Sequence, residues 1–443
     1  MLTFAKVLPR TAITRTQSSR RPAWLWPVLV AVLMGFIGLS AQAEPVAISP
    51  EGARATAVDI AYDAEGTAWL LWVQKGARIP GGGHASSDDL YLTRWPADGP
   101  PEAPVTVNPD AGSARASALS RARIAVDSSG GVHALYPVGD VSPAHGKPVI
   151  NIRYQMLHPV TQSEPAQLNT PAENDLSSTS HSNVGSAATF LSLSAGPDND
   201  LYALWIDSRH SAVTESNSWV YGSRSADNGA TWSTDTPLFE QVCPCCQPDT
   251  VWSHNQLLVS SRQVDADSHR DPHIHRVAAD MSHSSDPVRV GNGRWQLEGC
   301  PLKRISVAAG AGQEYVAWYA EMETPKGVWL GRRSTQDESF GDYTPLHPDA
   351  AVSDAPATAA HGNALWVAWH AKTADAGRGI YLSISDDGGA SLSPPERLSE
   401  LDSTAAFPAI ALNEREAIIG WEAGGQIVAM RRARTQTVAQ HEQ

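Results

Sequence analysis

The sequence predicts an all-β protein, a single β-propeller of six or seven four-stranded blades. The 34 glycines and 31 prolines among its 443 residues divide the chain into short apolar stretches. These stretches alternate apolar and polar residues as half-buried strands do, and no long stretch shows the 3.6-residue period of a helix. A strand–turn–strand module also recurs along the chain, as expected of propeller blades.

Each copy of the module has an alternating strand, a turn of the type Asp-x-x-Gly, and a second strand that in six of the seven copies ends in an aromatic residue. Four copies occupy 57–72, 123–136, 190–205 and 249–263, and the second strands of three more end at Trp318, Trp369 and Trp421. The copies follow one another at about 50 to 70 residues, which is too close for separate β-sandwich domains, and no linker divides them. We therefore expect one propeller over residues 46–434, with the recurrent tryptophans packed between blades.

The first 43 residues have the composition of an export signal. They contain five basic residues and no acidic ones, then a hydrophobic run and the small-residue sequence Ala41-Gln42-Ala43. Cleavage there predicts a periplasmic or secreted protein with no remaining membrane span; the alternative is an uncleaved N-terminal anchor. Residues 435–443 are expected to form a disordered tail.

The mature chain is strongly acidic. Loss of the five basic residues of the signal moves the formal net charge from −14 to −19. Such a surface argues against nucleic acid or anionic membranes as partners.

One segment has a specific turn pattern, Ser-x-Asp-x-Gly-x-Thr-Trp, formed by Ser225, Asp227, Gly229, Thr231 and Trp232. The aspartate is expected to bond backbone amides of its own turn, and the glycine to adopt a positive φ. A second copy at 385–392 has Ser391 in place of Thr and Leu392 in place of Trp.

This pattern resembles the Asp box of the sialidase superfamily, the BNR-repeat β-propellers. The segments Cys243-Pro244-Cys245-Cys246-Gln247 and Gly299-Cys300-Pro301 further resemble an exported bacterial sialidase-like group. The resemblance implies a propeller, usually of six blades, whose Asp boxes are structural and lie away from the catalytic centre. It also implies an arginine triad for a substrate carboxylate, a Tyr–Glu nucleophile pair and an aspartate acid/base. The sequence alone assigns none of these catalytic residues.

Strand alternation sorts the loops onto two faces. Loops that follow a blade's second strand share a face with those that lead into its first strand, and the Asp-box turns lie on the other face. The resemblance implies that the first of these faces binds the ligand, and arginines with acidic partners there suit an anionic or hydroxyl-rich molecule. The candidates are Asp207, Arg209, Arg262, Arg270, Asp271 and Arg304. The alternative is a solvated rim of ordinary ion pairs.

All four cysteines, Cys243, Cys245, Cys246 and Cys300, fall on this same face. Export and an even count favour disulfides, with Cys300 bonded to one member of the cluster and the other two paired locally. The alternative is a copper(I) or zinc site formed by Cys243, Cys245, Cys246, His273 and His275.

The leading functional hypothesis is an exported propeller that needs no cofactor and binds a ligand on the cysteine-bearing face. By resemblance, the ligand is a glycan or glycoconjugate. An active exo-glycosidase of the sialidase type ranks second, a periplasmic copper or zinc binding protein third, and a scaffold for protein assembly fourth.

Overall fold

Alternating apolar residues give each module a pair of strands, and two further strands complete every blade. The computed structural model describes residues 44–78, 86–141, 146, 148–159, 163–170, 188–209 and 218–434. These residues form 28 strands and one 3₁₀ turn, η1 (Pro197–Asn199). The described part of the chain contains no helix with the length and apolar character needed to cross a bilayer. The expected signal, 1–43, and tail, 435–443, lie outside the described residues.

The strands form seven antiparallel groups of four; the groups of blades 3 and 4 join into one eight-stranded sheet, and blade 7 takes its fourth strand from the start of the chain. Blades 1 and 2 contain β2 (Ala55–Tyr62), β3 (Ala68–Gln74), β4 (Asp89–Trp95) and β5 (Val105–Thr106), then β6 (Arg123–Val126), β7 (Val132–Val141), β8 (Pro148–His158) and β9 (Ala166–Gln167). Blades 3 and 4 contain β10 (Ala188–Ala195), β11 (Leu201–Asp207), β12 (Ser218–Ser225) and β13 (Thr236–Val242), then β14 (Thr250–Ser253), β15 (Gln256–Val264), β16 (Arg270–Ala278) and β17 (Val288–Arg289).

The remaining three blades follow the same order. Blades 5 and 6 contain β18 (Ile305–Gly310), β19 (Gln313–Ala320), β20 (Gly327–Ser334) and β21 (Gly341–Pro345), then β22 (Val352–His361), β23 (Ala364–Thr373), β24 (Ala376–Ser385) and β25 (Glu396–Arg397). Blade 7 contains β26 (Ala406–Leu412), β27 (Glu416–Ala423), β28 (Gln426–Ala433) and, as its outer strand, β1 (Val46–Ala47).

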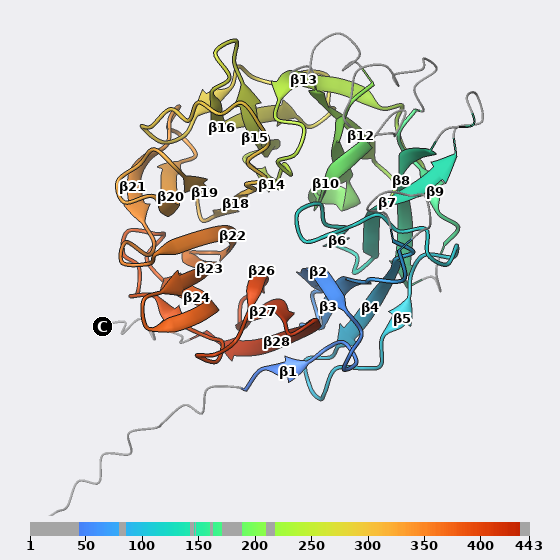
Figure 1. Cartoon of the computed structure of the whole chain (residues 1–443). Coiled ribbons are helices and arrows are strands. Elements are labelled where there is room, and N and C mark those ends of the chain that lie inside the picture. Colours follow the sequence, from blue (N-terminus) through green and yellow to red (C-terminus); the bar gives the residue numbers. More distant parts are fainter. Residues whose placement is uncertain are drawn as a thin grey trace, which may run out of the picture. The chain divides into compact units, whose positions relative to one another are not determined.

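The ring closes by pairing the two ends of the described chain. Strand β1 pairs antiparallel with β28, where Val46 faces Ala429 and Ala47 faces Val428 (Figure 1). The first strands of neighbouring blades contact one another around the whole ring, including β26 with β2. Blades 3 and 4 also join at their edge through the pair Val242 and Gln263. The seven predicted modules therefore correspond to seven blades, which confirms the predicted propeller.

Apolar side chains fill the space between blades. Trp72, Trp205, Trp318, Trp369 and Trp421 are all fully buried, as the recurrent aromatic position predicts. Burial of a large aromatic side chain contributes about 2 to 3 kcal/mol, so these positions hold adjacent sheets together.

Four first strands share an unusual backbone feature at one end. Ala57 in β2, Phe190 in β10, Ala355 in β22 and Phe407 in β26 have φ between 53° and 61°. Each lies at a shift in register between the first and second strands. A bulge with a non-glycine residue at positive φ costs about 1 kcal/mol or more, and such strain clusters at functional sites. The bulges turn backbone groups toward the channel, as described below.

The turn between β12 and β13 is held by the side chain of Asp227. Its carboxylate accepts bonds from the Thr231 amide at 2.8 Å, the Thr231 hydroxyl at 2.6 Å and the Ser225 hydroxyl at 2.8 Å. Asp387 makes the same three bonds in the turn between β24 and β25. Both turns join the last two strands of a blade, so they lie on the face opposite the cysteine loops.

We predict that Gly229→Ala destabilises the protein more than Gly130→Ala does. Both glycines have positive φ, +79° and +86°, where alanine costs about 1 kcal/mol. A Cβ at Gly229 would also lie 1.7 Å from the Tyr154 hydroxyl, whereas nothing lies within 4 Å at Gly130. Overpacking adds about 1 to 3 kcal/mol, so the difference is measurable by urea unfolding. Equal losses in the two variants would show that Tyr154 moves aside freely.

Candidate functional site

Charged residues of the first strands line the central channel. Arg123 of β6 forms ion pairs with Asp59 of β2 at 3.2 Å and with Asp249, just before β14, at 2.9 Å. Burial alone would lower the pKa of Arg123, but the two carboxylates raise it above the ordinary value. Asp249 also accepts bonds from the Val307 amide and the Ser306 hydroxyl of β18. This ion-pair network links blades 1, 2, 4 and 5.

Two further arginines on the channel wall make no ion pair with any carboxylate in the described part of the chain. Arg121 precedes β6 and is 1% exposed, and Arg304 precedes β18. Both bond the carbonyl of Pro408, Arg121 at 3.2 Å and Arg304 at 2.7 Å. The Nε atoms of both are buried without a hydrogen-bond partner. We call Arg121 and Arg304 the arginine pair.

Burial leaves the positive charge of the arginine pair poorly compensated. It lowers the pKa of Arg121 to about 10, despite the opposite effect of Asp59 and Glu422. Burial also lowers the pKa of Arg304, and the charge of Arg121 lowers it further. Buried cations that lack a carboxylate partner are costly, so the site favours an added negative charge.

The bulges of β22 and β26 hold the arginine pair. Arg304 bonds the carbonyl of Ala355 at 3.1 Å, and Arg121 bonds the carbonyl of Phe407 at 2.7 Å. Both acceptors are positive-φ residues. The strained backbone therefore positions the two guanidinium groups toward one point.

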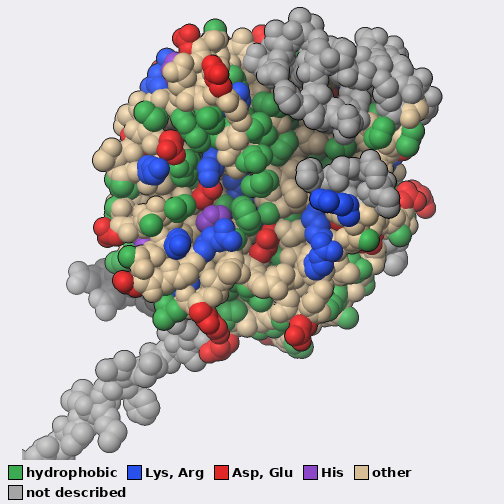
Figure 2. Space-filling model, viewed as in Figure 1, with side chains coloured by type: hydrophobic (Ala, Val, Ile, Leu, Met, Phe, Trp, Pro, Cys, Tyr) green, Lys and Arg blue, Asp and Glu red, His purple; other side chains and the backbone are tan. Residues whose placement is uncertain are grey.

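A small depression of about 10 Å³ lies beside Arg304 on the cysteine face. Leu119, Cys245, Leu302, Asp354 and Phe407 line it beside Arg304, and Leu119 and Leu302 are 37% and 40% exposed. The part of the channel lined by the arginine pair, Arg123, Asp59 and Asp249 contains an open cavity of about 70 Å³. Figure 2 shows basic side chains gathered near the middle of the ring with acidic ones beside them.

A tyrosine–carboxylate pair lies in blade 5, the blade whose first strand follows Arg304. The Tyr319 hydroxyl donates a hydrogen bond to Glu321. Burial and this bond both raise the pKa of Tyr319 above its ordinary value. The ammonium group of Lys303 lies 4.3 Å from the centre of the Tyr319 ring and also pairs with Asp354.

The six predicted ligand-binding candidates do not form one cluster. Arg209 pairs with Asp207 at 2.7 Å and Asp235 at 2.6 Å and packs on Tyr221, so it holds blade 3 together. Arg262 is 2% exposed and bonds the carbonyls of Arg270 and Tyr319.

Asp271 and Arg270 also have local partners. Asp271 accepts a bond from the Trp295 amide and pairs with Arg294, and Arg270 bonds the Leu297 carbonyl. Of the six, Arg304 alone lines the described channel cavity.

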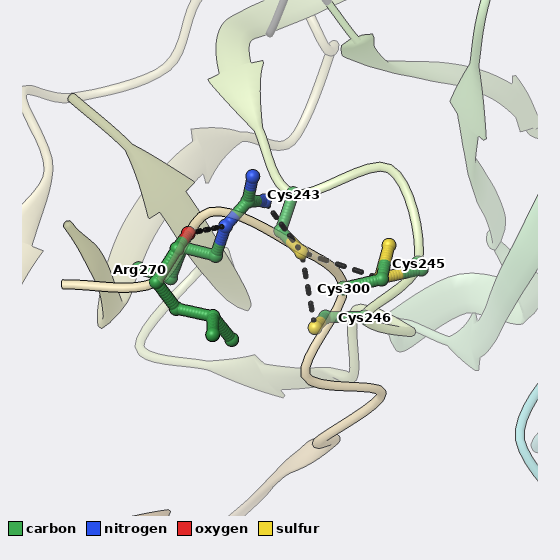
Figure 3. Close-up of a disulfide and its surroundings, with 6 residues drawn as sticks. Cys243, Cys245, Cys246, Arg270 and Cys300 are labelled. Atoms are coloured by element: carbon green, nitrogen blue, oxygen red, sulfur yellow. Dashed lines mark hydrogen bonds between the residues drawn. A yellow bond between two sulfur atoms is a disulfide. The ribbon is translucent and has the colours of Figure 1, made fainter. Parts of the chain in front are cut away.

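The four cysteine sulfurs lie together (Figure 3). Cys245 and Cys300 form a disulfide that links the loop leading into β14 to the loop leading into β18. Cys243 and Cys246 are buried thiols whose Sγ atoms lie 3.2 Å apart. The expected bond between Cys300 and a cluster member is thus present, and the remaining two cysteines are adjacent but unbonded.

The two histidines of the predicted metal set contact other groups. His275 bonds the Ser261 hydroxyl at 3.1 Å and stacks on Phe239, and His273 bonds the carbonyl of Asp271. Among the described residues, the sulfurs of Cys243, Cys245 and Cys300 lie within 4.8 Å of one another, and His273 and His275 are not part of this group.

Sequence reasoning missed Arg121, Arg123, Asp59 and Asp249. One signal was available, because Arg121 and Arg304 occupy equivalent positions, each just before the first strand of its blade. Alignment of the modules by this position would have selected both.

Comparison with known proteins supports the fold. No family model matches the sequence, and no curated protein matches it. The structure is similar to an ulvan lyase, a polysaccharide lyase, with 12% identity, TM-score 0.54, 89% of this chain and 96% of that one. Also similar are a Hadza microbial sialidase (12% identity, TM-score 0.49, 88% of this chain and 95% of that one) and a mutant Trypanosoma rangeli sialidase (11% identity, TM-score 0.47, 88% and 57%). The similarity to the ulvan lyase shows a shared fold, and the blades of this chain confirm the predicted β-propeller.

We predict a pH dependence of stability from His370, which is 5% exposed. Its Nδ1 accepts the Phe407 amide at 3.2 Å, and burial lowers its pKa to about 4. The unfolded chain, with a histidine pKa of about 6.5, therefore binds a proton that the folded chain does not between these values. From pH 6.5 to 4 the unfolding free energy of the wild type should fall by up to about 3 kcal/mol more than that of His370→Gln. Equal slopes in urea titrations at each pH would contradict this.

Proposed function

We propose that this protein binds an acidic glycan or glycoconjugate, and that the arginine pair holds an anionic group of the ligand at the mouth of the central channel. The observation that carries the proposal is the contrast among three neighbouring arginines. Arg123 has two carboxylate partners, whereas Arg121 and Arg304 have carbonyl partners and no ion pair with a described carboxylate. A carboxylate or sulfate group can satisfy both guanidinium groups by charge-assisted hydrogen bonds.

The cavity has a volume of about 70 Å³, and Asp59 and Asp249 line it together with the arginines. We expect an anionic group of the ligand to enter it and to bond the arginine pair. The rest of the ligand would lie across the depression, where Leu119 and Leu302 present apolar surface.

The structural comparison agrees with an acidic saccharide. The similar ulvan lyase is bound to -[GlcA(1-4)Rha3S]-, a saccharide that carries a uronic acid. We extend only the ligand class to this chain, because the two sequences are 12% identical. The export signal at 1–43 would place the propeller in the periplasm or outside the cell, where it meets such polymers.

We predict that Arg304→Met weakens binding of a glucuronic-acid oligosaccharide by about tenfold or more, because a bond between charged groups contributes about 1.5 to 3 kcal/mol. Isothermal titration calorimetry measures the change. Arg94→Met is the matched control, because Arg94 lies on β4 and pairs with Glu102. A neutral glucose oligosaccharide should not bind. Equal affinity of both variants for the acidic glycan would contradict the proposal.

A second candidate function is exo-glycoside hydrolysis of the sialidase type. The specific observation in its favour is the hydrogen bond from Tyr319 to Glu321, because the sialidase resemblance implies a Tyr–Glu nucleophile pair. Glu321 is placed to take the phenol proton, which the raised pKa of Tyr319 makes necessary at neutral pH. Asp354, joined to the pair through Lys303, would serve as the acid/base.

If this second function holds, the protein releases the fluorophore from a fluorogenic sialoside between about pH 4 and 8, the range of carboxylate acid/base catalysis. Tyr319→Phe should then abolish release, because it removes the nucleophilic oxygen. Tyr343→Phe removes an equivalent hydroxyl that bonds the carbonyl of Phe340, and it should leave the rate unchanged. No release by the wild type would eliminate the hydrolase and leave the binding proposal standing.

A further inference from the structure

The chain's four cysteine sulfurs are in successive contact (Figure 3). Cys246 Sγ lies 3.2 Å from Cys243 Sγ, which lies 3.5 Å from Cys245 Sγ, which is bonded to Cys300. Cys243 and Cys246 are 0% and 3% exposed, while Cys300 is exposed. A buried dithiol therefore touches one sulfur of a disulfide whose other sulfur belongs to an exposed residue.

The surroundings of Cys243 favour its thiolate. As a thiolate it would accept a hydrogen bond from Cys246, whose Sγ lies 3.2 Å away, and the Arg270 guanidinium lies 3.4 Å from its sulfur. These contacts lower the pKa of Cys243 to about 6. Burial and the neighbouring Cys243 raise the pKa of Cys246. The thiolate is the form that attacks disulfides, and here it is the one in contact with Cys245.

We propose that Cys243 is the nucleophile of an internal thiol–disulfide exchange that moves the disulfide from Cys245–Cys300 to Cys243–Cys246. The proposal rests on the sulfur contacts and on Arg270. It is independent of the proposed ligand and needs no external oxidant.

The exchange takes two steps and balances within the chain. The Cys243 side chain first turns into line with the Cys245–Cys300 bond. Its thiolate then attacks Cys245 Sγ, a Cys243–Cys245 bond forms, and Cys300 leaves as a thiolate that takes a proton from water. Cys246 then gives its proton to the hydroxide left by that transfer and attacks Cys243 Sγ, and Cys245 leaves as a thiolate. One disulfide and two thiols are present before and after.

The two isomers differ at the channel mouth. The Cys245–Cys300 bond fastens the loop before β14 to the loop before β18, which contains Leu302 and Arg304. Cys245, Leu302 and Arg304 all line the depression at the mouth. After exchange, the Cys243–Cys246 bond lies within the loop before β14, and no disulfide joins that loop to the loop before β18. The site therefore has one state in which the two loops are cross-linked and one in which they are not.

The test is alkylation of the native protein without reductant. Excess iodoacetamide is added between pH 5 and 8.5, the reaction is acid-quenched, and tryptic peptides are identified by mass. Cleavage after Arg224, Arg262, Arg294 and Lys303 places three cysteines in peptide 225–262 and Cys300 in peptide 295–303. The two peptides stay linked in the Cys245–Cys300 isomer and separate in the other.

In the wild type we expect alkylated Cys300 on a separate peptide and an internal disulfide in 225–262. The rate should rise through about pH 6, where Cys243 ionises. Cys243→Ser should lose this product, with the two peptides still linked. Arg270→Met keeps all four cysteines and should shift the midpoint of the pH profile upward, a change that a general loss of folding would not produce.

Three results would overturn the proposal. The first is a wild type whose peptides stay linked at every pH, as in Cys243→Ser. The second is purified protein with no free thiol, because both pairs are then oxidised and nothing remains to attack. The third is stoichiometric copper or zinc that blocks alkylation, which would make the cluster a metal site.

Discussion

The placement of Arg123 between Asp59 and Asp249 is the interaction on which the channel depends. It joins the first strands of blades 1 and 2 to the loop before β14 through one buried guanidinium group. A buried ion pair is stable only when each charge is matched, and here both nearby carboxylates are engaged by the same arginine. The arginine pair farther along the wall is therefore left to backbone carbonyls, which carry only partial charge.

Backbone strain and charge are concentrated at the same end of the channel. The positive-φ residues Ala355 and Phe407 supply the carbonyls that hold the arginine pair, and His370 accepts the Phe407 amide. Packed tryptophans between blades make the strained conformation tolerable, because the strands on both sides are fixed by burial. The rigid ring thus holds two buried arginines without an ion-pair partner among the described residues, and under our proposal an anion of the ligand stabilises them.

Local patterns explain why the fold was predictable. Strand alternation, the turn at Asp227 and the buried Trp positions act within one module, so they can be read without knowing what packs against it. The site depends on contacts between modules. Arg209 was predicted to bind a ligand because its second partner, Asp235, is 26 residues away in the sequence. Arg121 was not predicted because its acceptor, Phe407, is 286 residues away. The sequence likewise placed the cysteines on one face, but it did not determine which two of them form the disulfide.

The most direct test of the central claim is a crystal structure of the protein with a glucuronic-acid oligosaccharide bound at saturation. We predict the uronate carboxylate within hydrogen-bonding distance of both Arg121 and Arg304, with the sugar ring outside the channel across Leu119 and Leu302. A ligand bound elsewhere, with the arginine pair still bonded only to the carbonyls of Ala355, Phe407 and Pro408, would contradict it.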